Sequence, residues 1–256
     1  TVNSWGSRTK QRYKALQLSL NRPFRNGLML KGAYTLSEAK NMADEDGWQG
    51  LTWNHPIKYD DNFALAGFDR THVAQLGFLY ELPFFKDAQG AAKAILGGWQ
   101  INGIGSWYSG TPYSIGGTNN ALNCQGCGSV FINFAGESPE PIGGVGSGST
   151  DTFYDKSLFS QPTGLDANGF GTSDRNQFRR PSVWNVDLSV FKSFQVGRVR
   201  PELRIEVANL FNHVNWGAPV TTFTANNFLQ FIPANAENAK ITAGARSDQI
   251  GLRLEF

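Results

Sequence analysis

Apolar and polar residues alternate with a period of two in seven short blocks of the chain. Such alternation puts apolar side chains on one face of a β-strand and polar side chains on the other, whereas a helix repeats every 3.6 residues. The pattern predicts seven β-strands, over residues 13–20, 28–37, 71–82, 99–108, 185–190, 202–207 and 249–256. Helical spacing is confined to one short stretch, residues 91–96.

The connections between the predicted strands differ strongly in length. A turn with Pro23, Asn26 and Gly27 joins the first two strands into a β-hairpin, and another short turn lies around Gly197. Three long loops are expected, at residues 38–67, 110–181 and 212–246, with a connection of medium length at 83–98. Loops of this length are unusual in a compact soluble domain. In a transmembrane β-barrel, by contrast, short periplasmic turns alternate with long extracellular loops.

Alternation alone leaves a soluble β-sandwich open as well, because its polar faces also meet water. The asymmetry of the connections favours the barrel, and so do aromatic residues near the ends of the predicted strands. Barrels carry aromatic girdles at both membrane interfaces. The candidates for such girdles are Tyr34, Tyr80, Trp99, Trp107, Trp184, Phe194 and Phe211. We therefore predict an all-β fold, a segment of an antiparallel transmembrane β-barrel of about seven strands with long extracellular loops.

Composition agrees with a protein whose surface is not mainly charged. Charged residues are 17% of the 256 residues, against about 25% in ordinary soluble domains, while aromatic residues reach 13%. No apolar run approaches the ~18 residues of a membrane-spanning helix, and the mean hydropathy is −0.33. The net charge is +2 without blocks of Lys or Arg, which argues against nucleic acid as a partner.

The parity of the strands predicts that the chain is part of a longer one. If the short turns lie in the periplasm and the last strand ends there, the first of seven strands also runs inward and Thr1 begins outside. A complete barrel of this type has an even number of strands. We expect further strands upstream, so that residues 1–256 form the C-terminal portion of a larger barrel.

Charged side chains interrupt the polar rows of the last strands and are expected to line the barrel lumen. Opposite charges on adjacent strands can pair, at about 0.2 to 1 kcal/mol each. Arg204 should pair with Asp187 or with an acid on its other flank. A network that fixes the strand register and a direct role in ligand passage or plug contact both remain open. The set comprises Asp187, Glu202, Arg204, Glu206, Arg253 and Glu255.

The loops hold few groups that suggest chemistry. Cys124 and Cys127 form a lone CxxC without the helix of a redox site or the further ligands of a zinc site, so we expect a disulfide in an oxidising compartment. The acids 44–46 and 60–61 match no calcium loop and are expected to be solvated, and the glycine-rich residues 143–149 to be flexible. No nucleophile has a recognisable setting. We expect no enzyme activity, no metal and no cofactor.

Several stretches resemble TonB-dependent outer-membrane receptors, closest to the subgroup with an N-terminal carboxypeptidase-regulatory-like domain. The resemblance covers most strands and leaves the long loops uncovered. It rests on FDRTHVAQLGFLYELPF (68–84), GGWQINGIGSWYSGTPYS (97–114), NVDLSVFKSF (185–194), LRIEVANLFNHVNWGAP (203–219) and QIGLRLEF (249–256).

The resemblance implies a barrel of about 22 strands around a plug. An inner-membrane energy-coupling protein of the TonB type would act on an N-terminal box, and this chain would supply the last seven strands. Plug and box are absent from residues 1–256, so this portion alone is not expected to transport. The outer-membrane assembly machinery would recognise the terminal strand through Ile250, Leu252, Leu254 and Phe256.

Three functions follow as hypotheses. The first is an outer-membrane receptor that takes up an unidentified small ligand or oligomer by TonB-coupled transport, with its barrel in lipid and its specificity in the three long loops. The second is a secreted β-sandwich that binds glycans. The third is a passive outer-membrane anchor or adhesin. Iron chelates, cobalamin, oligosaccharides and peptides are all ligands of the wider family, and nothing in the loops selects among them.

Overall fold

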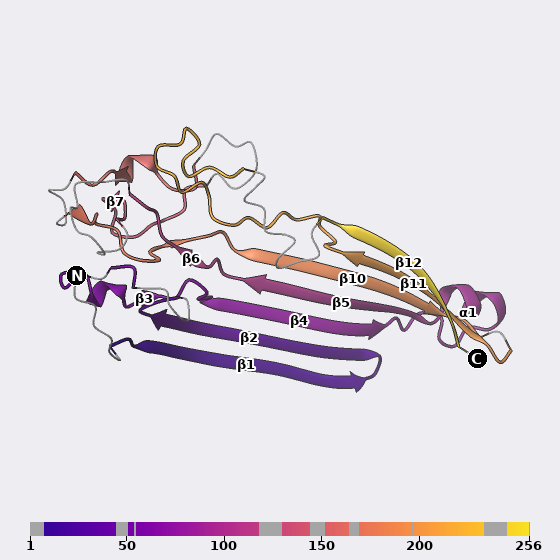
Figure 1. Ribbon diagram of the computed structural model, residues 1–256. Helices are drawn as coiled ribbons and strands as arrows, with labels where there is room; N and C mark the ends of the chain where they lie inside the picture. Colours follow the sequence, from indigo (N-terminus) through magenta and orange to yellow (C-terminus); the bar gives the residue numbers. More distant parts are fainter. Residues whose placement is uncertain are drawn as a thin grey trace.

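The computed structural model describes residues 8–44, 51–53, 55–117, 130–143, 152–163, 169–195, 197–232 and 245–255. Within them, seven long strands form one antiparallel sheet in which sequence neighbours are also spatial neighbours (Figure 1). The seven predicted strands and the all-β class are confirmed. The strands are β1 (Gln11–Arg25), β2 (Leu28–Asn41), β4 (His72–Glu81), β5 (Trp99–Tyr108), β10 (Val183–Ser193), β11 (Arg200–Ala208) and β12 (Ser247–Glu255).

The first hairpin shows how local sequence sets the register. Asn26 and Gly27 have φ angles of 53° and 77°, and a type I′ turn needs positive φ at both positions. Pro23, which was predicted to belong to the turn, instead lies within β1, beside a register shift between Arg22 and Arg25. β1 is an edge strand, so a residue without an N–H group interrupts no ladder there. The turn is therefore shorter, and the strand longer, than predicted.

All short connections lie at one end of the sheet and all long ones at the other (Figure 1). We call the end with the short connections the turn end and the opposite end the loop end. The turn end has the turns after β1 and β10 and the connection between β4 and β5, which contains helix α1 (Gly90–Leu96). The predicted helical stretch at residues 91–96 is confirmed. Among the described helices, none is both long and apolar enough to cross a membrane.

In the described parts of the long connections, all helices and strands are short. A two-residue strand, β3 (Ala64–Leu65), pairs with the end of β2. The others form two separate pairs, β6 (Pro112–Tyr113) with β9 (Phe178–Arg179) and β7 (Asn133–Phe134) with β8 (Phe159–Ser160). The single-turn helices are η1 (Asp60–Asn62) and η2 (Lys156–Leu158).

The register sorts the side chains of the sheet into two faces. Residues directly opposite each other across a ladder share a face, and the pairs Leu16 with Leu36, Val190 with Ile205, and Ile205 with Ile250 connect apolar rows across strands. We call this the apolar face. The other, polar, face carries residues such as Gln75, Asn102 and Glu206, with Leu79, Ile104 and Phe191 as apolar exceptions. The apolar face comprises Leu16, Leu18, Leu20, Leu28, Leu30, Tyr34, Leu36, Ala74, Leu76, Phe78, Tyr80, Trp99, Ile101, Trp107, Trp184, Val186, Leu188, Val190, Leu203, Ile205, Val207, Ile250, Leu252 and Leu254.

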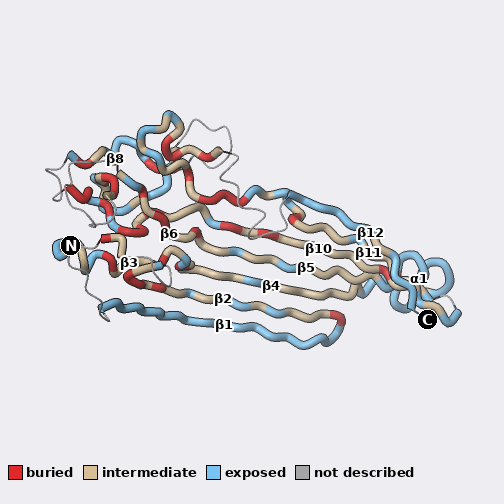
Figure 2. The backbone as a smooth tube through the Cα atoms, viewed as in Figure 1, coloured by how far each residue is buried: buried red, intermediate tan, exposed pale blue. Residues whose placement is uncertain are grey.

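No second layer covers the apolar face among the described residues. Leu16 is 55% exposed, Ile205 37% and Leu252 68%, and Leu188 is half-buried. Buried residues gather instead in the long loops (Figure 2). A secreted β-sandwich would enclose these leucines between two sheets, and the only further sheets described are two-residue pairs. The sandwich hypothesis is therefore wrong for this fold.

Aromatic side chains form two bands on the apolar face. Tyr34, Trp107 and Trp184 lie at the loop end, where Tyr34 Oη is 2.8 Å from His72 Nδ1 and Trp184 stacks on His213 with ring centroids 4.1 Å apart. Tyr80 and Trp99 lie at the turn end. Trp107 is eight positions after Trp99, a distance of about 27 Å along a strand. A strand tilted by about 40° spans about 20 Å of membrane in that length, close to the ~25 Å apolar band of a barrel.

Candidate functional site: the loop assembly and the polar face

The described parts of the three long loops pack into one body at the loop end of the sheet, which we call the loop assembly. Its larger cluster joins the second and third loops, and a smaller one joins Trp53 of the first loop to Phe131 and Phe170 of the second. The loops predicted to bind ligand therefore form a common surface and not three independent arms. The larger cluster comprises Tyr113, Ile115, Ile132, Phe134, Phe153, Tyr154, Phe159, Phe178, Trp216, Phe228, Leu229 and Phe231.

Phe178 of β9 lies at the centre of the larger cluster and is fully buried. Its ring centroid lies 5.3 Å from that of Phe134, 5.5 Å from Phe159 and 5.8 Å from Tyr154, and the Phe134 contact is edge to face. Burial raises the pKa of Tyr154 to about 12, so its hydroxyl stays neutral and donates to the carbonyl of Arg179 at 2.7 Å. Aromatic pairs of this geometry add about 0.5–1.5 kcal/mol each beyond area burial.

Arg175 is the main polar link between the second loop and the sheet. Its side chain is 3% exposed, and its Nη1 donates to the carbonyl oxygens of Asn41 at 2.7 Å and Asn62 at 2.6 Å. Its Nη2 donates to Asn41 Oδ1 at 2.6 Å and lies 3.0 Å from Asp44 Oδ1. One guanidinium thus holds the end of β2 and the first loop against a segment more than a hundred residues away. The planar fork of arginine suits this shared role.

Asp44 completes the same contact while its side chain stays 32% exposed, in line with the expectation that it is solvated. Its carboxylate accepts hydrogen bonds from the backbone N–H of Gly67 at 2.6 Å and from Asn176 Nδ2 at 2.9 Å. Burial alone would raise the pKa of Asp44. The hydrogen bonds from Gly67 and Asn176 and the charge of Arg175 outweigh it, and the pKa lies below its ordinary value. The neighbouring acids 45 and 46 lie outside the described residues.

A second buried ion pair ties the loop assembly to the sheet. The Asp69 side chain is fully buried, and its Oδ2 lies 2.6 Å from Arg179 Nη2. Asp69 Oδ1 accepts from the backbone N–H of Ala39 at 2.6 Å, and Arg179 Nη1 donates to the carbonyl of Gly110 at 2.9 Å. Sequence reasoning did not identify Asp69, Arg175 or Arg179, since nothing in their neighbourhoods distinguishes them from other loop charges. The one feature of the sequence that indicated a packed loop region is the high density of Phe and Tyr residues in the second loop.

Acid is expected to loosen the loop assembly. The folded-state pKa of Asp44 is lowered, so the carboxylate stabilises the fold above its unfolded pKa of about 3.9, and this stability is lost as pH falls through the folded pKa. Near-UV circular dichroism of the buried aromatic residues should therefore fall below about pH 4. Asp44→Asn should weaken the signal at neutral pH and remove part of the acid transition. An acid transition identical in the variant would contradict this role.

A polar cavity lies between the first and second loops and is our candidate for ligand contact. Its volume is about 410 Å³, and Lys58 Nζ lies 3.0 Å from Asp61 Oδ2 beside it. Burial raises the pKa of Asp174, although the charge of Lys58 opposes this. The described residues contain no group of three side chains able to hold a metal ion. The carboxylates and the Gln177 amide of its lining can hydrogen-bond to hydroxyl or amine groups of an organic ligand. Its lining includes Lys40, Asp60, Asp61, Phe63, Asp174 and Gln177.

The loop assembly lies over the outer end of the polar face. Ala39, Asn41, Val183 and Asn185 are polar-face residues near the loops, and all four are buried. Apolar-face residues near the loop end are more exposed to solvent, and Leu36, for example, is 39% exposed. The loops therefore cover the polar side of the sheet more closely than the apolar side, where Trp184 stacks on His213 of the third loop.

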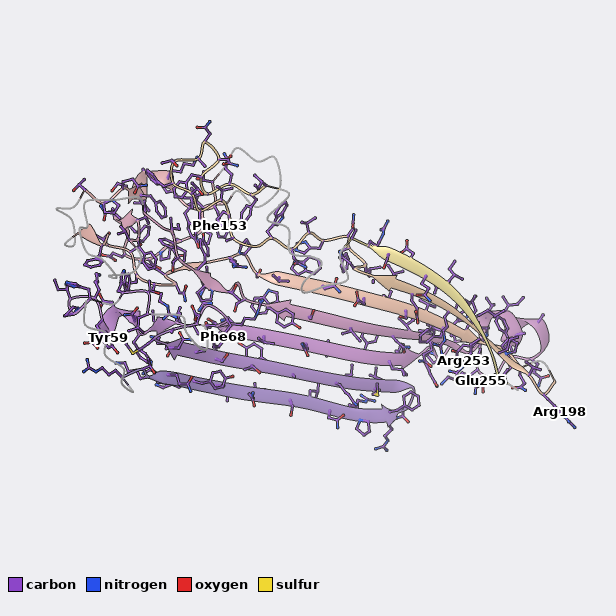
Figure 3. All side chains as sticks on the ribbon, viewed as in Figure 1. Tyr59, Phe68, Phe153, Arg198, Arg253 and Glu255 are labelled. Atoms are coloured by element: carbon purple, nitrogen blue, oxygen red, sulfur yellow. The ribbon has the colours of Figure 1, made fainter. Side chains whose placement is uncertain are left out.

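The structure splits the predicted charge network into two parts. Arg253 and Glu255 lie at the turn end of β12 (Figure 3), with Arg253 Nη2 3.0 Å from Glu255 Oε1. On β11, Arg204 Nε is 2.6 Å from Glu202 Oε1. Asp187 lies farther toward the loops. It accepts from Asn185 Nδ2 at 2.7 Å and from the backbone N–H of Asn209 at 2.8 Å.

The pairing of Arg204 with Asp187, one of its two predicted partners, does not form. β10 and β11 place Arg204 opposite Phe191, several residues from Asp187, and its guanidinium lies 5.1 Å from the Phe191 ring centroid. Glu206 lies opposite Ser189 and Gln249, also on the polar face. All six predicted charges share the polar face, but they do not form one continuous network.

Some predicted residues lie outside the described part of the chain. Cys124, Cys127 and Phe256 are among them, as are residues 144–149 of the glycine-rich run. The loop disulfide therefore stays a prediction. Of the proposed assembly signal, Ile250, Leu252 and Leu254 lie on the apolar face and are 75%, 68% and 50% exposed.

Comparison with known proteins gives one match. The family model described as "Outer membrane beta barrel domain" matches residues 1–248. The chain belongs to this family. Membership places the protein in the bacterial outer membrane, and it explains why the apolar face is uncovered, since that face meets lipid. Neither a curated protein nor a solved structure matches the chain. The family description applies equally to uptake receptors and to passive anchors.

Proposed function

We propose that this chain forms the last strands of an outer-membrane receptor barrel that takes up a ligand with energy delivered by a TonB-type inner-membrane protein. The observation that carries the proposal is the loop assembly over the polar face, held by two ion pairs that each have one buried partner, Arg175 in one and Asp69 in the other. A passive anchor needs only strands and short turns. A packed body with a polar cavity between its loops is suited to binding a ligand before it enters.

The sheet itself supports a larger barrel. β1 and β12 are its two edges, and both run from the loop end to the turn end (Figure 1). Two strands that run in the same direction cannot close an antiparallel barrel against each other. Closure then requires an odd number of additional strands, in keeping with seven strands out of about 22. In that barrel the polar face lines the lumen, and the upstream chain supplies the plug and the coupling box.

Uptake by living cells tests the proposal. Cells with the complete gene and cells lacking it are given labelled iron chelates, cobalamin, oligosaccharides and peptides, with and without a protonophore. The proposal predicts that deletion removes the uptake of at least one class, and that the protonophore abolishes the same uptake. Unchanged uptake of every class, or uptake that persists without proton-motive force, would favour an anchor or a passive pore.

A further inference from the structure

The connection between β4 and β5, residues 82–98, ends the sheet on its turn side and is the longest connection there. A barrel turn on this side is ordinarily short. Here the connection contains α1 and four large apolar side chains that stay exposed, Phe84 at 61%, Phe85 at 49%, Ile95 at 63% and Leu96 at 47%. The two large apolar residues of the helix therefore find no cover among the described residues.

Two side chains of the apolar face hold the helix at the lipid side of the sheet. Trp99 Nε1 donates to the carbonyl of Ile95 at 3.0 Å, and Lys192 Nζ donates to the carbonyl of Gly97. Trp99 and Lys192 pair across β5 and β10 on the apolar face, and Lys192 is 2% exposed. The exposed side chains of the connection thus continue the surface that already meets hydrocarbon.

Charge and backbone conformation fit a position at the lipid headgroups. Lys86 and Lys93 lie between the two apolar pairs, with Asp87 as the one acid between Leu82 and Gly98. Amphipathic segments of this kind lie at the boundary between headgroups and acyl chains. Phe85 has a φ of 56°, which is rare for a bulky residue and strains the backbone. Contact between the Phe85 ring and acyl chains would compensate for the strained backbone and for the exposure of this side chain to water.

We propose that residues 82–98 form an interfacial segment that lies in the phospholipid leaflet at the turn end of the barrel. Phe84, Phe85, Ile95 and Leu96 enter the acyl region, and Lys86 and Lys93 face the phosphates. The segment fixes the depth of the wall at that interface, next to the Trp99 band. The inference depends on the lipid contact of the apolar face and is independent of uptake or ligand.

Spin labels test this placement in the complete protein reconstituted in phosphatidylcholine and phosphatidylglycerol vesicles. Cysteine replaces Ile95, Leu252 or Arg198 in a Cys124→Ser, Cys127→Ser background. Leu252 reports the apolar face, and Arg198 lies in the other turn at the same end (Figure 3). The relaxation by oxygen, relative to a water-soluble nickel chelate, is measured at each site. We expect the ratio at Ile95 to match that at Leu252 and to exceed that at Arg198 several-fold.

The three sites separate the possible failures. If Ile95 behaves like Arg198 while Leu252 reports lipid, the connection is exposed to the periplasm and the inference is wrong. If Leu252 also behaves like Arg198, the lipid contact of the whole apolar face is wrong. A second label at Phe84 repeats the measurement outside the helix, so that a local effect of the label on α1 cannot decide the result.

Discussion

Replacing Arg175 with alanine is expected to detach the loop assembly from the sheet. The buried guanidinium donates to two carbonyl oxygens and the Asn41 side chain and pairs with the partly exposed carboxylate of Asp44. The variant leaves these acceptors without their donor and the carboxylate of Asp44 without its charge partner. Leaving a buried acceptor without its donor costs about 1–3 kcal/mol. The loops gain mobility, while the ladder hydrogen bonds of the seven strands remain.

Proteolysis of intact cells measures this effect. A protease added from outside should cleave the loops of Arg175→Ala at far lower doses than those of the natural protein. Arg175→Lys should fall between the two, because an ammonium keeps the charge but cannot serve all acceptors in the plane of a fork. Arg198→Ala, in an exposed turn at the opposite end, is the matched control and should leave the loops resistant. Equal resistance of Arg175→Ala and the natural protein would show that the ion pairs do not hold the assembly.

The strands follow from local sequence, and so they could be predicted. Alternation of Leu16, Leu18 and Leu20 with small polar residues depends only on neighbours within the strand, and Asn26 with Gly27 fixes the first register through a turn that needs positive φ. Pro23 misled the prediction, because proline signals a turn in most contexts but is tolerated in an edge strand.

The loop assembly could not be predicted, because its contacts join distant parts of the chain. Arg175 and Asn41 are 134 positions apart, and the aromatic cluster brings together side chains of the second and third loops. No periodicity marks such residues. Alternation was enough to predict which face carries the charged side chains. The partner of Arg204 depends on rotamers and register, and it is Glu202, two positions away, and not Asp187.

A charge placed on the apolar face should cost far more than the same charge one position away. Leu188 lies four residues from both Trp184 and Lys192 in β10, near the middle of the apolar band, between Gly103 and Val207. Ser189 points to the polar face, beside Asn102 and Glu206. An arginine on the lipid face at the bilayer midplane destabilises a barrel by about 2–4 kcal/mol. Ser189→Arg should cost under about 0.5 kcal/mol, as most surface substitutions do.

The decisive measurement is the urea dependence of unfolding for Leu188→Arg and Ser189→Arg in the complete protein, reconstituted in lipid vesicles and followed by the gel shift of the unheated barrel. The account predicts a loss of about 2–4 kcal/mol for the leucine variant and almost none for the serine variant. Equal losses, or a greater loss for Ser189→Arg, would mean that the row through Leu188 does not face hydrocarbon.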